Sequence, residues 1–220
     1  MATGEILIIN PNSNPEVTAG LDAAVAPLRL QGGPEIRCLT LDEGPYGIES
    51  QADAAAVVLP LRRVVTTSEA SAFVIACYSD PGLMVCREAT AKPVFGIAES
   101  GTLAALQRGD RFGVVAILSR SIPGHLRSLR QQGLTARLAG ERPLELTVAE
   151  LANEDRTWNK LLATAMALKD EDGANVVVLG CAGMSRYRVR LEQALGVPVI
   201  DPTQAATVAA LGTLLLQGAR

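Results

Sequence analysis

The sequence repeats itself, in degenerate form, after about half its length. FVIAC ends at Cys77, and VVLGC ends at Cys181, 104 positions further along the chain. KPVFGIAES and VPVIDPTQA align Pro93 with Pro198 at nearly the same offset, and EILIINPNS aligns with FGVVAILSRS. Because such self-similarity is typical of a duplicated structural unit, we expect two similar lobes with a cleft between them.

Short apolar runs with helical stretches between them indicate an α/β fold built on parallel sheets, a class that tolerates the low aromatic content of 3%. The predicted strands are 5–9, 36–41, 72–76, 93–97, 112–118, 174–180 and 197–200, with one more at either 135–138 or 144–148. The predicted helices are 15–29, 51–70, 81–90, 99–107, 122–132, 155–171, 185–195 and 203–217. We predict two pseudo-symmetric lobes with the active site between them, residues 1–98 plus 203–220 and residues 99–202. The last helix would cross back onto the first lobe.

Three positions carry helix-boundary signals. Asp80-Pro81 and Asp201-Pro202 each place a capping side chain before a proline at the first helical position. Gly196 follows Leu195 as a C-terminal stop. At Asp80 a helix cap is favoured over a catalytic acid.

Charge and termini point to a small-molecule partner. The formal net charge is -3 with the signs interspersed, so neither a nucleic acid nor an anionic membrane is an expected partner. The start, MATGEILIIN, has neither a signal peptide nor a membrane span, and a cytoplasmic location is expected. The four cysteines are then thiols, and without a dense ligand cluster no metal site is predicted.

Ligands of open parallel sheets bind beyond the carboxyl ends of the strands. This rule selects the turns that begin at Asn10, Cys77, Ser119 and Cys181. The duplication makes Cys77 and Cys181 equivalent positions on facing lobes. A helix N-terminus would lower the pKa of each thiol toward neutrality. Removing a proton from one face of a carbon and delivering another to the opposite face needs two such groups.

The backbone N–H groups that follow the two cysteines are candidates for stabilising an enolate oxygen. They belong to Tyr78 and Ser79 in the first lobe and to Ala182 and Gly183 in the second. With these donors no metal or cofactor is required. The remaining thiols, Cys38 in mid-strand and Cys86 in mid-helix, are interpreted as packing residues, and His125 as a solvated or packed helix residue.

Taken together, these segments resemble the aspartate/glutamate/hydantoin racemase superfamily, most closely its hydantoin and allantoin racemase branch. The similarity spans nearly the whole chain and is carried by INPNS (9–13), IACYSDPGL (75–83), FGVV (112–115), SIP (121–123), VLGCAGM (178–184) and GVPVID (196–201). It implies that Cys77 and Cys181 are the catalytic pair of a cofactor-independent racemase or epimerase, and that the protein is a homo-oligomer. It also implies that the first turn and the residues after each cysteine hold the substrate.

The first turn bears on the substrate. Relatives that act on free glutamate or aspartate typically carry an acidic residue there, whereas this chain has Asn10 and Asn12, which favours a neutral ring such as a 5-substituted hydantoin or allantoin. Tyr78 stands where hydantoin racemases often have Phe. Asn10, Asn12 and Ser13 are also suited to a turn and helix cap. Ser119 and Ser121 are candidate contacts from the second lobe.

Three alternatives to this function stay open. One is the racemisation of an amino acid or derivative. Another is decarboxylation or cis–trans isomerisation, although the presence of both cysteines argues against the one-cysteine decarboxylases. The third is a two-lobed protein that binds a small solute without chemistry.

Overall fold

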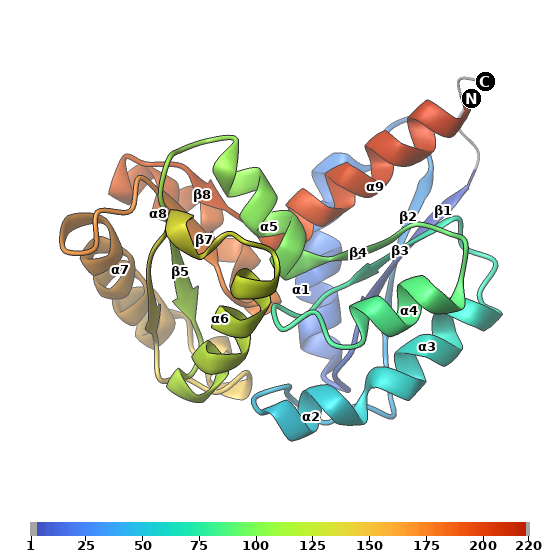
Figure 1. The fold of residues 1–220 in the computed structure, drawn as a ribbon, viewed down its shortest axis with the longest axis horizontal. Coiled ribbons are helices and arrows are strands. Elements are labelled where there is room, and N and C mark those ends of the chain that lie inside the picture. Colours follow the sequence, from blue (N-terminus) through green and yellow to red (C-terminus); the bar gives the residue numbers. More distant parts are fainter. Residues whose placement is uncertain (1–3, 219–220) are drawn as a thin grey trace.

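Two parallel four-stranded sheets form the two halves of the molecule (Figure 1). The structure is a computed structural model and describes residues 4–218. The first sheet has the order β2-β1-β3-β4 and the second the order β6-β5-β7-β8. The strands are β1 (Glu5–Asn10), β2 (Glu35–Thr40), β3 (Ala72–Ile75), β4 (Val94–Gly96), β5 (Phe112–Ala116), β6 (Leu138–Pro143), β7 (Val176–Leu179) and β8 (Val199–Ile200). Since the strand order is the same in both sheets, the predicted α/β fold with two similar lobes is confirmed.

Helices cover both faces of each sheet (Figure 1). Those of the first half are α1 (Pro15–Val25), α2 (Gln51–Ala56), α3 (Val58–Thr67) and α4 (Leu83–Ala89), with a 3₁₀ turn at Ala26–Leu28. Those of the second half are α6 (Ile122–Gln131), α7 (Glu154–Asp170) and α8 (Arg188–Leu195), with 3₁₀ turns at Ser119–Ser121, Thr135–Arg137, Ala149–Ala152 and Ala182–Tyr187.

Two helices join the halves. α9 (Pro202–Gly218) follows the last strand of the second sheet but packs on β1, β3 and β4 of the first. It lies against α5 (Ile97–Leu106), which also contacts β7 of the second sheet. The predicted lobe boundary between residues 98 and 99 falls inside α5, and the division into two domains stays a prediction.

The strands are apolar at successive positions because both faces of each sheet are buried. Along β1, Ile6 and Ile8 join one core cluster while Leu7 and Ile9 join the cluster on the opposite face. β7 divides its residues between two clusters in the same way. Each large aliphatic side chain buried in this way contributes about 1.5–3 kcal/mol to folding. A strand enclosed on both sides therefore reads as a continuous apolar run and not as an alternating one.

The edge strand of the second sheet differs from the prediction. Neither 135–138 nor 144–148 is the strand, because β6 runs between them and is only half-buried along its length. The apolar stretch after it is bent at Glu145, whose φ is 51°. Leu144 and Leu146 nevertheless donate backbone N–H groups to the carbonyls of Ala116, at the end of β5, and of Ile117, just after it. An edge position explains the weak apolar signal of β6.

The single helix predicted over residues 51–70 is divided into α2 and α3. Pro60 has no backbone N–H, and its ring crowds the carbonyl four residues earlier, that of Ala56. α2 ends at Ala56, and α3 begins at Val58.

Asp80 caps a helix, but not the predicted one. The helix after it begins at Leu83, and the Asp80 carboxylate instead accepts hydrogen bonds of 2.9 Å from the backbone N–H groups of Ala98 and Glu99 in α5. A Cβ at Gly96 would lie 2.4 Å from this carboxylate, so glycine is required there. The signals at Asp201 and Gly196 are confirmed, as the N-cap of α9 and the left-handed C-cap of α8.

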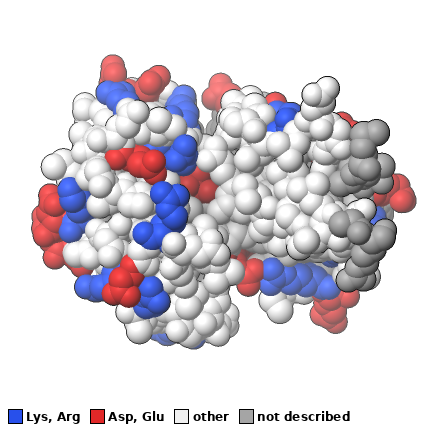
Figure 2. All heavy atoms as spheres, turned by 90° about the horizontal axis from the view of Figure 1, so that it is seen from above, with Lys and Arg blue, Asp and Glu red and all other residues white. Residues whose placement is uncertain are grey.

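The surface carries charges of both signs without a continuous field of either. Figure 2 shows Lys, Arg, Asp and Glu interspersed over one half of the molecule and a largely uncharged strip across its middle. Within residues 4–218, no helix is long and apolar enough to cross a membrane.

Candidate active site

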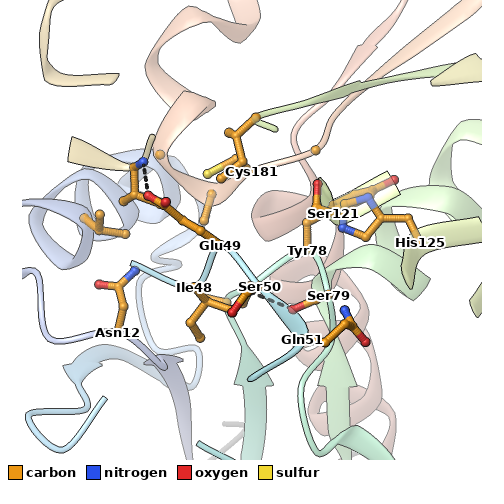
Figure 3. A pocket seen from close by; sticks show the side chains of 18 residues that line it. Asn12, Ile48, Glu49, Ser50, Gln51, Tyr78, Ser79, Ser121, His125 and Cys181 are labelled. Atoms are coloured by element: carbon orange, nitrogen blue, oxygen red, sulfur yellow. Dashed lines mark hydrogen bonds between the residues drawn. The ribbon is translucent and has the colours of Figure 1, made fainter. Parts of the chain in front are cut away.

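A pocket of about 50 Å³ lies where the carboxyl ends of the two sheets face each other (Figure 3). Loops after β1, β2, β3, β5, β6 and β7 supply its walls. The lining residues are Asn12, Val17, Ile48, Glu49, Ser50, Gln51, Ala76, Cys77, Tyr78, Ser79, Ile117, Ser121, His125, Val148, Gly180, Cys181, Ala182 and Gly183. The structure thus brings most of the predicted site residues together in one cavity.

Cys77 follows the buried strand β3. Its carbonyl accepts a hydrogen bond from the backbone N–H of Asp80, which closes a tight turn, and Asp80 adopts a left-handed φ of 44°. The Cys77 Sγ lies 3.2 Å from the hydroxyl of Ser79. Because α4 begins only at Leu83, Cys77 sits on a turn and not at a helix N-terminus, contrary to prediction.

Cys181 occupies the equivalent position after β7. Its carbonyl accepts from the backbone N–H of Met184 at the start of the 3₁₀ turn. Gly180, just before it, approaches β5 so closely that a Cβ would lie 2.5 Å from the carbonyl oxygen of Val115. The strand end is therefore held against β5, which fixes the place from which the Cys181 side chain enters the pocket.

Burial dominates the ionisation of both thiols. It raises the pKa of Cys77, and hydrogen bonds from Ser79 offset part of that shift. It also raises the pKa of Cys181 to about 12, against a lowering by the backbone N–H of Gly183. The expectation that helix N-termini lower both pKa values is wrong, since desolvation outweighs the local N–H donors.

The two thiols are electrostatically coupled. Negative charge on Cys77 is one of the causes that raise the pKa of Cys181. Interacting groups of this kind lose their protons in two separate steps. A thiolate at Cys77 therefore disfavours ionisation of Cys181.

Asn10 and Asn12 were both predicted to contact substrate, but only Asn12 lines the pocket. Asn10 is fully buried, and its amide nitrogen donates to Asn12 Oδ1, to the Asn14 carbonyl and to Thr18 Oγ1. Its oxygen accepts from the backbone of Asn12, so its hydrogen bonds hold the turn. Asn12 lines the pocket, and its Nδ2 makes no hydrogen bond within the described part of the chain.

Of the other residues predicted to contact substrate, some line the pocket and one does not. Tyr78, Ser79, Ala182 and Gly183 line the pocket. Tyr78 is only 6% exposed and packs edge to face on His125, with ring centroids 5.1 Å apart. Ser119 does not line the pocket; Ser121 does, and its hydroxyl donates to the Leu118 carbonyl.

His125 is buried and lies within hydrogen-bond distance of a carboxyl group, in agreement with its interpretation as a packed helix residue. It is 8% exposed, and its Nδ1 lies 2.5 Å from Glu141 Oε1. Its ring also reaches the lining of the pocket, on the side of Tyr78 and Ser121 in Figure 3.

Sequence reasoning missed the loop after β2. Ile48, Glu49, Ser50 and Gln51 line the pocket, and Glu49 is its one acidic lining residue among the described part of the chain. The rule that selected the turns after β1, β3, β5 and β7 applies equally to β2. The sequence signal that could have identified this loop was its carboxylate, Glu49. No matching acidic residue in the second half of the sequence drew attention to it.

A wider pocket of about 380 Å³ adjoins the first. The two share the side chains of Val17 and Val148 and the backbone of Ala182 and Gly183. A ligand held between the cysteines has room to extend past Gly183 into this space.

Metal ligands and lysines bear on whether the pocket could hold a cofactor. In residues 4–218, no group of three or more His, Cys, Asp or Glu side chains is placed to bind a metal ion. The chain has three lysines, Lys92, Lys160 and Lys169. Each donates through Nζ to a backbone carbonyl and none lines the pocket.

Thiol alkylation provides a test of the ionisation described above. Because the thiolate is the reactive form and burial raises both pKa values, inactivation by iodoacetamide should be slow at pH 7 and accelerate steeply as the pH rises through the alkaline range. Peptide mapping should find Cys77 or Cys181 modified before Cys38 or Cys86, because the first two line the pocket, whereas Cys38 lies in β2 outside the pocket lining and Cys86 is fully buried. Early labelling of Cys38 or Cys86, in step with loss of activity, contradicts the assignment.

Comparison with known proteins places the fold and the pocket in a family. The sequence matches the Asp/Glu/Hydantoin racemase family over residues 6–210. A hydantoin racemase of Paenarthrobacter aurescens is 38% identical over 207 residues, which cover 91% of this chain and 87% of that protein. The allantoin racemase structure from Klebsiella pneumoniae superposes with a TM-score of 0.90 at 32% identity and covers 98% of this chain and 89% of the other. That from Pseudomonas fluorescens gives 0.91 at 27%, with coverages of 97% and 92%. The chain belongs to the Asp/Glu/Hydantoin racemase family and is an isomerase of the racemase type.

Proposed function

We propose that the protein racemises a small carbon acid without a cofactor, with Cys77 and Cys181 as the acid and base on opposite faces of the reacting carbon. The observation that carries the proposal is the position of the cysteines, at the ends of the equivalent strands β3 and β7 and in the lining of one pocket. One thiolate and one thiol are the two forms that the reaction consumes and regenerates.

The proton balance closes within this pair. The thiolate removes the proton from Cα–H and becomes a thiol, and the C–H electron pair moves into an enolate. The opposite thiol then delivers its proton to the other face of the same carbon and becomes a thiolate. The enzyme ends with the two protonation states exchanged, ready for the reverse enantiomer, and proton exchange with water restores the starting form.

The substrate class proposed is a 5-substituted hydantoin or allantoin. Relatives that match this chain over most of its length are described as hydantoin and allantoin racemases. In such rings the reacting C–H lies beside a carbonyl, which accepts the electron pair as an enolate. The unpartnered Nδ2 of Asn12 is a donor for a ring carbonyl, and the adjoining wider pocket has room for the substituent.

Racemisation of a free amino acid is the second candidate. It requires the pocket to hold a carboxylate, and among its described lining residues none is Lys or Arg while one is Glu49. These contacts favour the neutral ring. Decarboxylation requires a carboxylate in the same pocket and is disfavoured on the same ground.

Solvent deuterium exchange tests the proposed function. In D2O, protein dialysed against a chelator should catalyse the incorporation of deuterium at C5 of L- and D-5-benzylhydantoin or of allantoin and should racemise these compounds. Alanine, aspartate and glutamate should remain unlabelled. We expect no metal requirement because the two thiols supply both the base and the acid that the reaction needs. Activity lost on dialysis and restored by a metal, or an absorbance band typical of an aldimine, would be the opposite outcome. Thermal stabilisation by these ligands without any exchange would indicate a binding protein.

A further inference from the structure

Glu49 sets the charge of the pocket. It comes from the loop between β2 and α2 in the first half of the molecule and lies beside residues of the second half. Its negative charge is one of the causes that raise the pKa of Cys181. No described lining residue is Lys or Arg, so a bound ligand meets a carboxylate and no lysine or arginine at the pocket wall.

The Glu49 carboxylate is fixed in place by contacts on its far side. The side chain is 17% exposed. Oε1 accepts a 2.9 Å hydrogen bond from the backbone N–H of Val148, and Oε2 accepts a 2.6 Å hydrogen bond from Arg120. Since each carboxylate oxygen can accept about two hydrogen bonds, one lone-pair site per oxygen is left for a ligand. The group is a preorganised acceptor.

Asn12 complements this acceptor with a donor. Its Oδ1 is occupied by the Asn10 amide and the Asn14 backbone N–H. This fixes the amide so that Nδ2, which has no partner in the described part of the chain, is the group offered to the pocket. Figure 3 shows Asn12 and Glu49 on the same side of the pocket, with Tyr78 and His125 on the other. One side therefore presents an N–H donor and a charged acceptor.

We propose that Glu49 is the specificity-determining residue of this site. It accepts a hydrogen bond from a substrate N–H while Asn12 donates to a carbonyl of the same ring. It also excludes substrates that carry a carboxylate at this position. This inference rests on the proposed function and deepens it: the substrate class is an uncharged ring with an amide N–H and a C=O on one edge.

Glu49 stabilises one kind of ligand and disfavours another. A neutral N–H gains a charge-assisted hydrogen bond to a carboxylate, and bonds of this kind are stronger than those between neutral groups. A carboxylate of the ligand is repelled by Glu49 and must give up its hydration without a cationic partner at the wall. Discrimination then arises from an unfavourable contact with the wrong ligand as well as a favourable one with the right ligand.

Glu49→Gln tests the inference because it removes the charge and keeps the size and one acceptor oxygen. With 5-benzylhydantoin, KM should rise roughly tenfold to a hundredfold, the range for losing a hydrogen bond to a charged group, while kcat changes much less. Methylation of the ring nitrogen that Glu49 contacts should raise the KM of the wild type by a larger factor than it raises the KM of Glu49→Gln, because the wild type loses a hydrogen bond to a charged acceptor and the variant one to a neutral acceptor. Of the N1-methyl and N3-methyl analogues, one should behave in this way. N-carbamoylphenylalanine, the ring-opened carboxylate, should inhibit Glu49→Gln more strongly than the wild type.

Glu43→Gln is the matched control, because it makes the same change in the same loop between β2 and α2, at a carboxylate that is 57% exposed and lies outside the pocket lining. Its KM and its inhibition by N-carbamoylphenylalanine should stay within about threefold of the wild type. If Glu43→Gln reproduces the changes seen in Glu49→Gln, the pocket carboxylate is not their cause and the inference is wrong.

The two proposals fail in different ways. A wild type that exchanges no deuterium into any hydantoin or allantoin overturns the proposed function. An active wild type with a Glu49→Gln variant of unchanged KM and unchanged inhibition by the carboxylate overturns only the role of Glu49. The thermal unfolding midpoint of each variant identifies any that fails to fold. If Glu49→Gln fails to fold, the role of Glu49 is tested with the two N-methylated analogues on the wild type alone. Equal KM values for both analogues and the parent ring would mean that Glu49 accepts no N–H of the substrate.

Discussion

Cys77→Ser and Cys181→Ser should each lose racemisation by roughly a hundredfold or more, because a positioned acid or base typically contributes about 10²–10⁴ in rate. A hydroxyl is far too weak an acid and too weakly ionised a base at neutral pH to replace the thiol. The remaining cysteine can still remove a proton from the face that it serves. Each variant should therefore exchange deuterium into one enantiomer of the substrate only, and the two variants into opposite enantiomers.

The measurement is C5 deuterium incorporation, followed by NMR with each pure enantiomer, alongside racemisation followed by polarimetry. Cys38→Ser is the control, since Cys38 lies in β2, outside the pocket lining, and its replacement should leave both rates near those of the wild type. Near-normal racemisation by either pocket variant would falsify the two-thiol mechanism and leave a single-cysteine or non-catalytic role.

Leu161→Ala should destabilise the protein by about 2–5 kcal/mol, the range for truncating a buried leucine to alanine. Leu161 lies on α7, is fully buried, and belongs to the cluster that packs α7 and α8 onto the second sheet. Truncation removes apolar contacts and leaves a cavity that the surrounding strands can fill only in part. The observable is the urea midpoint of unfolding at an unchanged slope.

Met166→Ala is the matched control on the same helix. Met166 is 46% exposed, so its truncation should change the stability by no more than about 0.5 kcal/mol. Equal effects of the two substitutions would mean that α7 does not pack on the sheet through the face described here.

The periodic and duplicated parts of the sequence predicted most of the fold. Strands enclosed on both faces must be apolar at successive positions, and this is visible without any tertiary information in β1, β3, β5 and β7. β6 was misplaced because an edge strand is buried on neither face strongly enough to require an apolar run. The break between α2 and α3 was missed, although Pro60 carried the signal for it.

The site was predicted in the same uneven way. Cys77 and Cys181 were selected because a repeat and a rule about strand ends identify the same two positions. Asn10 and Asn12 look alike in sequence, and only the hydrogen bonds of the turn separate the fully buried one from the one that faces the pocket. Asp80 precedes a proline as a cap should, yet it caps α5, a helix that begins 17 residues later.

By itself, then, the sequence determined the two-lobed parallel fold and the pair of cysteines, since both follow from periodicities that are local or repeated. Only the tertiary structure decided the pKa values of the two cysteines and which side chains surround them. Burial raises both pKa values, which an isolated turn with free N–H groups would lower. The carboxylate of Glu49 reaches the pocket only because the loop after β2 contacts Val148 and Arg120, 99 and 71 residues away in the chain. Desolvation and contacts between distant segments depend on where the chain folds, and no local pattern of residues encodes them.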